Sequence, residues 1–276
     1  MTAPLPNNLT SVTLSVVSHG HGQQVLDMLQ SFIQSGLLQH WQVQVIVTLN
    51  IHEPALLLAL EQAHWPFAVQ ILENAQPRGF GANHNQALQH TRSAWLCVVN
   101  PDIRWCVLSP PQLQDRLSAT VLTLPNSTNG KPIGLYCPTQ ITAEGLVQDF
   151  ARTLPTPWGL AARWAARQRN ARAQPGVAQS VSQAHWVNGA CMLFPTPLYR
   201  QLGGFNQRYF MYCEDVDICL RLQLEGYRLA PLPITVVHAA QRNTRHQRQH
   251  LRWHIRSLIK LWCSAPFWRY CITRKI

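Results

Sequence analysis

Charged residues are few in this sequence, and acidic residues are especially scarce. Only 13% of the 276 residues are Asp, Glu, Lys or Arg, and 12 acids stand against 23 Lys and Arg, a formal net charge of +11. A typical globular chain is charged at about a quarter of its positions. With 46% hydrophobic residues, the chain is too apolar for disorder and long enough for one large α/β domain or two small ones. Because carboxylates are rare, their positions are informative.

Other absences exclude several protein classes. The eight cysteines include no Cys-x-x-Cys pair, which excludes a zinc ribbon, and a chain of this length needs no disulfide framework. No run of about 18 apolar residues occurs, so we expect no membrane-spanning helix. The opening MTAPLPNNLT lacks the basic and apolar regions of a signal peptide. We therefore expect a basic protein in the reducing cytosol.

The few acids and the many basic residues are segregated along the chain. Four acids fall within 12 residues, at Glu214, Asp215, Asp217 and Glu225, and none follows. Ten basic residues lie from Arg228 to the end. A second acid-free stretch, 150–213, contains Arg152, Arg163, Arg167, Arg169 and Arg172. The acidic group is explained either by surface pairing with nearby arginines or by a catalytic or metal-binding role.

Apolar runs and helical patterns alternate over the first hundred residues. We expect strands at 12–18, 43–49, 69–72 and 94–99, and helices at 25–33, 55–63 and about 82–91. This alternation predicts βαβ units and a parallel sheet covered on both faces. The chain is less regular from 110 to 183, apart from an expected helix near 160–173, and it becomes extended again at 186–194 and 227–238.

The segment 244–263 has the pattern of an amphipathic helix. One stripe contains Leu251, Ile255, Leu258 and Trp262, and an adjacent basic stripe contains Arg245, Arg252, Arg256 and Lys260. We expect Pro266 to end this helix. The apolar stripe suits either packing on the domain or the interface of an anionic membrane, and one helix can do both.

Polar residues collect where the expected strands end, which is where α/β sheets bind ligands. These ends carry His19-Gly20-His21, the 49–53 loop, the 74–85 loop and Asn100-Pro101-Asp102. Asp102 suits either a turn or a metal ligand. The glycines after Arg78 suit either a plain turn or a loop whose N–H groups approach a phosphate at a helix start.

Together, these motifs resemble glycosyltransferase family 2, and more narrowly the bacterial rhamnosyltransferases of O-antigen assembly. The motifs are VSHGH, GFGANHNQAL, CVVNPDI, WVNGACMLF, GGFNQRYFMYCEDVDICLRLQLEGYRL and a final His238. The resemblance covers 11–240 and implies an α/β GT-A fold with a mainly parallel central sheet. A Rossmann-like nucleotide-sugar-binding half (11–109) and an acceptor-binding half (110–240) would form one catalytic domain, 1–240. A basic amphipathic helical tail, 241–276, would follow.

The resemblance also implies roles for individual residues. Asp215, paired with Glu214, corresponds to the catalytic base, and Asp102 with His238 to a site for Mg²⁺ or Mn²⁺. Donor binding is expected from His19, Asn50, Arg78, Gly79, Asn85 and Asp102, and the acceptor side from Gly189, Ala190 and Asp217. Relatives usually have Asp where this chain has Leu49, which leaves the nucleobase to a backbone group, Asn50 or Glu53.

The implied reaction is inverting sugar transfer, with rhamnose from dTDP-rhamnose as donor and a polyprenyl-pyrophosphate-linked saccharide as acceptor. Asp215 would take the acceptor proton, and like-charge repulsion from Glu214 or Asp217 would raise its proton affinity. The basic helix and tail would hold the protein peripherally at an anionic membrane surface, on the cytoplasmic face of the inner membrane.

Three other interpretations remain. A nucleic-acid-binding protein fits the charge, but no helix-turn-helix, zinc-finger or RNP-like motif is present, so we expect no nucleic-acid partner. A nucleotidyltransferase would need a basic Gly-rich signature near the first strand, which His19-Gly20-His21-Gly22 lacks. A degenerate transferase kept as an assembly partner is indicated only by Leu49.

Overall fold

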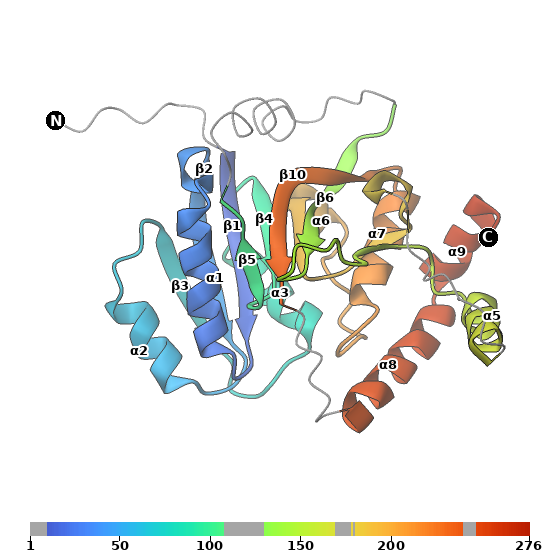
Figure 1. The fold of residues 1–276 in the computed structure, drawn as a ribbon, viewed down its shortest axis with the longest axis horizontal. Coiled ribbons are helices and arrows are strands. Elements are labelled where there is room, and N and C mark those ends of the chain that lie inside the picture. Colours follow the sequence, from blue (N-terminus) through green and yellow to red (C-terminus); the bar gives the residue numbers. More distant parts are fainter. Residues whose placement is uncertain (1–9, 108–129, 169–177, 179, 240–246) are drawn as a thin grey trace.

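A single mixed sheet forms the centre of the protein in the computed structural model, which describes residues 10–107, 130–168, 178, 180–239 and 247–276 (Figure 1). Within these residues its strand order is β3-β2-β1-β4-β9-β6-β10-β5. The strands are β1 (Thr10–Ser18), β2 (Trp41–Leu49), β3 (Ala68–Glu73), β4 (Trp95–Val99), β5 (Ile103–Trp105), β6 (Ile133–Ile141), β9 (Cys191–Pro195) and β10 (Arg228–His238). A separate pair joins β7 (Ala151–Arg152) to β8 (Trp186–Val187).

The direction of the strands brings distant segments to one edge. The four strands β3, β2, β1 and β4 run parallel, as do β6 and β10. Strand β9 runs antiparallel to β4 and β6, and β5 antiparallel to β10. The start of β9 therefore meets the carboxyl ends of the parallel strands, and residues 188–190 reach the turn that follows β4.

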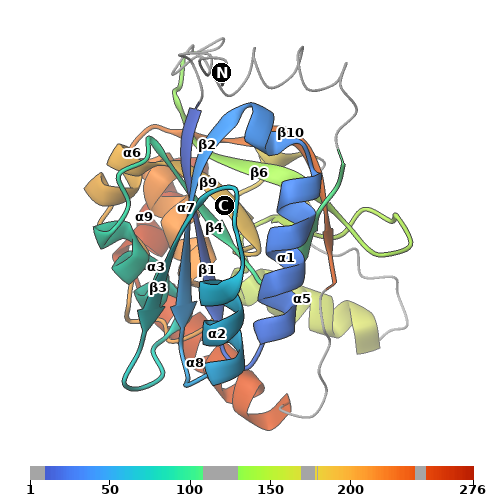
Figure 2. The ribbon, with the colours of Figure 1, turned by 90° about the vertical axis from the view of Figure 1, so that its left-hand side faces the viewer.

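Helices cover both faces of the sheet. They are α1 (Gly22–Gln34), α2 (Pro54–Gln62), α3 (Phe80–Gln89), α5 (Pro157–Gln168), α6 (Thr196–Gln201), α7 (Glu214–Leu224), α8 (Gln247–Trp262) and α9 (Ala265–Arg274). Short 3₁₀ turns lie at Leu37–Gln39 and Val181–Gln183. One buried cluster joins α1 and α2 to the sheet, and a second joins α6 and α7 to its other face. Figure 2 looks along the sheet from its β3 edge, with α1 on one side and α3 and α6 on the other.

The irregular middle of the chain was the least well anticipated. Strands β5 and β6 were not expected, and β6 lies inside the sheet between β9 and β10. The helix expected at 160–173 is α5, which begins earlier, and its expected end lies outside the described residues. The expected domain boundaries at 109–110 and 240–241 also lie outside them.

The C-terminal segment differs from the expectation. Pro266 does not end the helical region but lies in the first turn of α9, where its missing N–H costs nothing. Leu261 of α8 with Phe267, Tyr270 and Cys271 of α9 are buried in a third cluster with α7. On α8, Leu251 and Ile255 are exposed, whereas Ser257 and Leu261 are buried. No helix among the described residues is both long and apolar enough to cross a membrane.

Candidate active site

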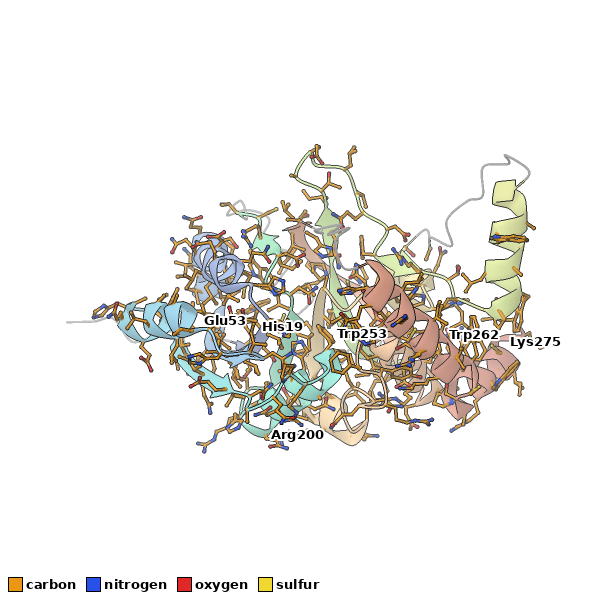
Figure 3. The ribbon with its side chains drawn as sticks, turned by 90° about the horizontal axis from the view of Figure 1, so that it is seen from below. His19, Glu53, Arg200, Trp253, Trp262 and Lys275 are labelled. Atoms are coloured by element: carbon orange, nitrogen blue, oxygen red, sulfur yellow. The ribbon has the colours of Figure 1, made fainter. Side chains whose placement is uncertain are left out.

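The candidate site lies at the carboxyl edge of the sheet, at the ends of β4 and β10, the start of β9 and the N-terminus of α7. The Asn100 N–H donates to the Ala190 carbonyl at 2.8 Å. In the segment just before β9, the Gly189 N–H donates to Asp215 Oδ2 at 3.1 Å. Residues 189–190 therefore connect the turn that carries Asp102 to the helix that carries Asp215. Figure 3 looks onto this edge, with His19 labelled on it.

Asp102 and His238 come together as the sequence indicated. His238 Nε2 lies 3.5 Å from Asp102 Oδ2, and both side chains are mostly buried. The Ala239 N–H donates to the Asp102 carbonyl at 3.1 Å, and His238 pairs with Ile103 across β10 and β5. Asp102 Oδ1 is buried without a hydrogen-bond partner. An unsatisfied carboxylate oxygen beside an imidazole is a donor set that suits a divalent cation such as Mn²⁺.

Gln148 orients the His238 ring, a role that nothing in the sequence marked. Its Nε2 donates to the His238 carbonyl at 2.6 Å, and its Oε1 lies 3.1 Å from His238 Nδ1. Because an amide oxygen can only accept, we assign the imidazole proton to Nδ1. The Nε2 lone pair then faces Asp102. A carbonyl that fixes the tautomer of a histidine ligand in this way is common around metal sites. The described residues contain no group of three or more His, Cys, Asp and Glu placed for a metal ion.

Glu214 and Asp215 begin α7, with Glu214 buried and Asp215 partly exposed. Asp215 Oδ1 accepts from the Val216 N–H at 2.8 Å, while its Oδ2 accepts from Gly189. Burial raises the pKa of Asp215 to about 6, and these hydrogen bonds and the positive charge of Arg152 limit the rise. Burial and the charge of Asp215 raise the pKa of Glu214 to about 8. Asp215 therefore ionises first, and Glu214 holds a proton at neutral pH.

The physical cause of the raised Asp215 pKa differs from the one expected. Burial comes first among its causes, and like-charge repulsion acts mainly on Glu214. Glu214 is only 6% exposed, and its Oε2 has no partner. The two residues before it, Tyr212 and Cys213, have φ angles of 71° and 65°. Two consecutive non-glycine residues in the left-handed region indicate a strained approach to the helix, as is found at functional sites.

Asp217 does not lie on the acceptor side. It is fully buried and forms an ion pair with Arg221 Nε at 2.7 Å. Arg221 in turn donates to the carbonyls of Leu202 at 2.6 Å and Gly204 at 2.8 Å. Asp217 thus fixes the turn before the 206–213 loop. One full turn of helix separates Arg221 from it, so the pair stabilises α7 itself.

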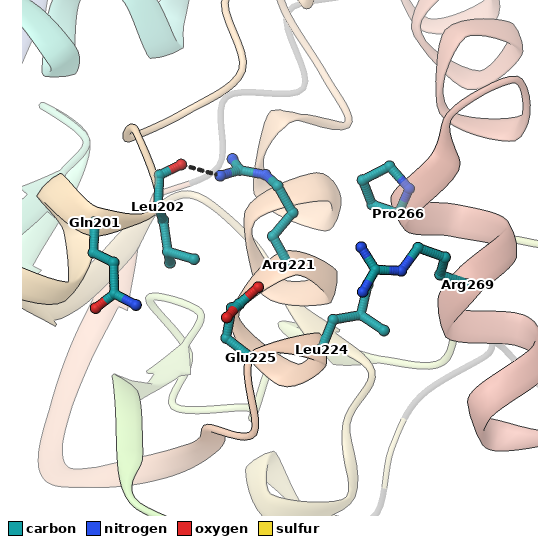
Figure 4. A pocket seen from close by; sticks show the side chains of 7 residues that line it. All are labelled: Gln201, Leu202, Arg221, Leu224, Glu225, Pro266 and Arg269. Carbon is teal, nitrogen blue, oxygen red and sulfur yellow. Dashed lines mark hydrogen bonds between the residues drawn. The ribbon is translucent and has the colours of Figure 1, made fainter.

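A pocket beside Arg221 is separate from this site. It has a volume of about 300 Å³ and lies between α6, the end of α7 and the start of α9 (Figure 4). It is lined by Gln201, Leu202, Arg221, Leu224, Glu225, Pro266 and Arg269. At a rise of about 1.5 Å per residue, the far end of α7 lies roughly 15 Å from Asp215. The pocket is therefore not the place where Asp215 would act.

On the donor side, Asn50 braces two loops instead of offering a free amide. Its Nδ2 donates to the Arg78 carbonyl at 3.0 Å and lies 3.2 Å from His19 Nδ1. Its Oδ1 accepts from the Arg78 N–H at 2.7 Å and from Asn74 at 2.9 Å. Glu53 Oε1 is likewise occupied, because it accepts from the Gly20 N–H at 2.9 Å. Both side chains considered for the nucleobase are thus used to shape the site.

His19 and Arg78 remain exposed beside that network. Arg78 uses Nη1 to donate to Gln86 Oε1 at 2.8 Å, which places its guanidinium over the first turns of α3. His19 lies at the end of β1, with its N–H donating to His21 Nδ1 at 3.3 Å. Both side chains are exposed at this edge, and their role in donor binding stays a prediction.

Gly79 and Asn85 connect the two halves, and the loop at Gly79 is not the open phosphate cradle that the glycines after Arg78 indicated. A Cβ at Gly79 would lie 2.6 Å from the Phe210 carbonyl oxygen, and the Phe80 N–H donates to that oxygen at 2.9 Å. Asn85 donates to the Phe205 carbonyl at 2.7 Å and accepts from the Phe205 N–H and the Tyr199 hydroxyl. The start of α3 is therefore covered by the 203–213 loop.

Arg152 is a second residue that sequence reasoning did not select. It pairs with Trp186 between β7 and β8, with its guanidinium 5.3 Å from the indole centre, and forms an ion pair with Asp149 at 3.0 Å. Its charge limits the burial-driven rise in the pKa of Asp215, and burial followed by the same charge lowers the pKa of His254. The positive charge of Arg152 thus favours the ionised form of Asp215. The acid-free stretch contained the signal, but nothing there distinguished Arg152 from the other arginines.

Comparisons with known proteins identify the family of the chain. A family model described as glycosyltransferase like family 2 matches residues 7–255. An N-acetylglucosaminyl-diphospho-decaprenol L-rhamnosyltransferase from Mycobacterium tuberculosis is 29% identical over 176 residues, 59% of this chain and 53% of that protein. The rhamnosyltransferase WbbL of Escherichia coli is 40% identical over 77 residues, 27% of this chain and 29% of that protein. The chain thus spans about half the length, or less, of the curated relatives it matches.

Solved structures show the same fold. A mannosyltransferase from Pyrobaculum calidifontis, in complex with GDP-Man and Mn²⁺, matches with a TM-score of 0.58 at 17% identity, over 94% of this chain and 66% of that one. GalNAc-T7 with UDP, GalNAc and Mn²⁺ matches with a TM-score of 0.57 at 14% identity, over 83% of this chain and 43% of that one. The expected GT-A arrangement is confirmed.

Proposed function

The chain belongs to glycosyltransferase family 2, and from that membership we propose that it is an inverting glycosyltransferase that uses a nucleotide diphosphate sugar. The observation that carries the proposal is the position of Asp215. It is a carboxylate whose pKa lies below neutrality, held by the Gly189 N–H at the edge that also carries Asp102 and His238. A proton acceptor and a cation-binding pair at one edge are what direct displacement of a nucleotide diphosphate requires.

Asp215 acts as the general base. The acceptor hydroxyl oxygen forms a bond to the anomeric carbon while the bond from that carbon to the β-phosphate oxygen breaks. The hydroxyl proton passes to Asp215, and the electron pair of the broken bond leaves on the nucleotide diphosphate. Because its raised pKa keeps Glu214 neutral at pH 7, Glu214 adds no negative charge that would repel the carboxylate of Asp215. No covalent enzyme intermediate is needed.

Asp102 and His238 would hold a divalent metal ion. The unpartnered Asp102 Oδ1 and the His238 Nε2 lone pair are the ligands this chain offers. When bound, Mg²⁺ or Mn²⁺ offsets the negative charge that develops on the leaving diphosphate. Arg78, exposed near the start of α3, adds a second positive charge on the donor side.

Rhamnose from dTDP-rhamnose is the proposed donor sugar, and a polyprenyl-pyrophosphate-linked saccharide is the proposed acceptor. The names of the two rhamnosyltransferase relatives support rhamnose as the sugar, and the mycobacterial name alone supports a diphospho-polyprenol-linked acceptor. The product would enter O-antigen or another cell-surface polysaccharide. Because such an acceptor is anchored in a bilayer, the enzyme would work peripherally at the cytoplasmic face of the inner membrane.

Release of nucleotide from a panel of sugar nucleotides tests this function. The assay compares wild type, Asp215→Asn and the control Glu61→Gln, with and without Mn²⁺ and a polyprenyl-pyrophosphate-linked N-acetylglucosamine. Glu61 is an exposed carboxylate near the end of α2. We expect dTDP release from dTDP-rhamnose that requires metal, acceptor and Asp215. Release by folded Asp215→Asn at the wild-type rate would remove Asp215 as base.

A further inference from the structure

Helix α8 exposes an apolar ridge that no described part of the chain covers. The ridge consists of Leu251, Ile255 and Ile259, which are 57%, 48% and 51% exposed. Their spacing of four residues places them along one face of the helix. The opposite side of α8 is the one that packs, through Ser257 and Leu261. The ridge therefore lies on the face of α8 that takes no part in core packing.

Two exposed tryptophans lie on the neighbouring helices α5 and α9. Trp268 of α9 and Trp158 of α5 are each 47% exposed, and their rings lie 6.3 Å apart. Trp262, at the end of α8, accepts the Trp268 indole N–H with its carbonyl at 2.6 Å. Large indole side chains with one apolar end and one polar end are typical of membrane–water interfaces.

The charge beside the ridge selects an anionic partner. Arg252 and Arg256 flank the ridge and are exposed, and no acidic residue follows Glu225. A second copy of this chain would present the same positive charge and is disfavoured as an occupant. Nucleic acid matches the charge but offers no apolar phase for three aliphatic side chains. Anionic lipid offers both charge and hydrocarbon.

The inner side of α8 holds the loop that leads to the candidate base. Ser257 Oγ donates to the Met211 carbonyl at 2.8 Å, and Lys260 Nζ donates to the Arg208 carbonyl at 2.6 Å. His250 Nδ1 lies 2.7 Å from the Tyr212 hydroxyl. Figure 3 shows α8, with Trp253 labelled, at the same edge of the molecule as His19. One helix, α8, therefore carries both the ridge and the side chains that contact the loop before Asp215.

We propose that the ridge of α8 is a docking surface for an anionic lipid bilayer and that docking places the active-site edge against the membrane. The proposal deepens the proposed function, and it rests on that function only for the source of the acceptor. A lipid-linked acceptor lies at the bilayer surface, and α8 would hold the loop 206–213 and the carboxylates after it at that depth.

Co-sedimentation with vesicles tests the docking surface without measuring transfer. The probes are vesicles of phosphatidylglycerol and phosphatidylcholine, and of phosphatidylcholine alone. The ridge variant carries Leu251→Gln, Ile255→Gln and Ile259→Gln. Its control carries Leu58→Gln, Leu146→Gln and Val147→Gln, three aliphatic positions elsewhere that are 53%, 68% and 70% exposed. We expect the ridge variant to bind the anionic vesicles at least about tenfold more weakly than wild type, and the control to bind like wild type.

A charge pair extends the test. Arg252→Gln with Arg256→Gln is compared with Arg92→Gln and Lys131→Gln, which remove the same charge from other exposed positions. We expect only the first pair to weaken anionic binding several-fold. Equal binding of ridge and control variants would overturn the proposal. The proposal would also be overturned if wild type bound neutral and anionic vesicles equally well. Two further outcomes would overturn it: salt-resistant dimerisation that the ridge variant loses, or binding to RNA that depends on the ridge. If the triple variant misfolds by circular dichroism, Ile255→Gln alone gives the same comparison. A protein that docks but transfers nothing would fail the proposed function only.

Discussion

Two carboxylate regions share the carboxyl edge of the sheet, and their surroundings differ. At the end of β4, Asp102 has an imidazole nitrogen 3.5 Å away and one oxygen with no partner. At the start of α7, Asp215 has each oxygen bonded to a backbone N–H, and its neighbour Glu214 is buried without an opposite charge. The first region offers a carboxylate oxygen without a described hydrogen-bond partner to a cation, and in the second each Asp215 oxygen accepts one N–H and keeps a lone pair for a proton.

The difference shows how one residue type serves two kinds of chemistry. Cations bind where carboxylate oxygens are unsatisfied and an additional ligand is near, as at Asp102. Proton transfer needs a carboxylate whose pKa has been raised towards the working pH, and burial does this at Asp215. Replacing either carboxylate by its amide should therefore impair a different step: cation binding for Asp102 and proton transfer for Asp215.

Neutralising each carboxylate in turn should give the largest effects and separate the regions. We expect Asp215→Asn to lower turnover about 1,000-fold, the usual contribution of a general base, with Mn²⁺ and nucleotide affinity unchanged. We expect Asp102→Asn to weaken Mn²⁺ binding at least tenfold, because it removes a charged ligand. Turnover and Mn²⁺ binding, the latter by electron paramagnetic resonance with dTDP present, are measured on both variants. Loss of Mn²⁺ binding in Asp215→Asn would show that Asp215 also binds the cation and that the two regions form one site.

Removing Gln148 should weaken the first region alone. In Gln148→Leu the His238 ring loses the group that fixes its tautomer, and we expect Mn²⁺ affinity to fall about 10- to 100-fold. Gln70→Leu is a matched control, because Gln70 Nε2 lies 3.0 Å from His90 Nδ1 in an exposed pair far from this edge. Titration of Mn²⁺ against both variants measures the difference. Wild-type affinity in Gln148→Leu would show that His238 is oriented without it.

The regular parts of the fold were accessible from sequence because they depend on local patterns. The runs 12–18 and 43–49 are mostly apolar, and the strands β1 and β2 begin within two residues of their expected starts. Strand β6 was not accessible, because its segment has a proline and polar residues and is recruited by β9 and β10. For α8 the sequence showed an apolar stripe but not which side packs, since α7 and α9 decide that.

The candidate site divides along the same line. Asp102 and the pair Glu214–Asp215 stood out as rare carboxylates at expected element ends. Gln148 contacts a histidine 90 residues away, so no local pattern announced it. The sequence did not show that Asn50 is engaged. Its amide oxygen accepts from the Asn74 side chain and from the Arg78 N–H, contacts that exist only in the folded loops.

The smallest expected effect separates Glu214 from Asp215 by pH. The folded-state pKa of Glu214, about 8, is above its ordinary value of 4.5, so the folded protein holds a proton that the unfolded chain has lost. The free energy of unfolding of wild type should therefore fall as pH rises from 6 to 8, by at most about 1.4 kcal/mol per pH unit. Glu214→Gln cannot ionise, and its stability should change less over that window. Asp215 ionises lower, near 6, so the rise of kcat/KM through that pH should be retained in Glu214→Gln. Urea unfolding at pH 6, 7 and 8 measures the stability of both proteins, and a pH–rate profile measures kcat/KM. If the stabilities of wild type and Glu214→Gln changed in parallel with pH, Glu214 would already be ionised at neutral pH.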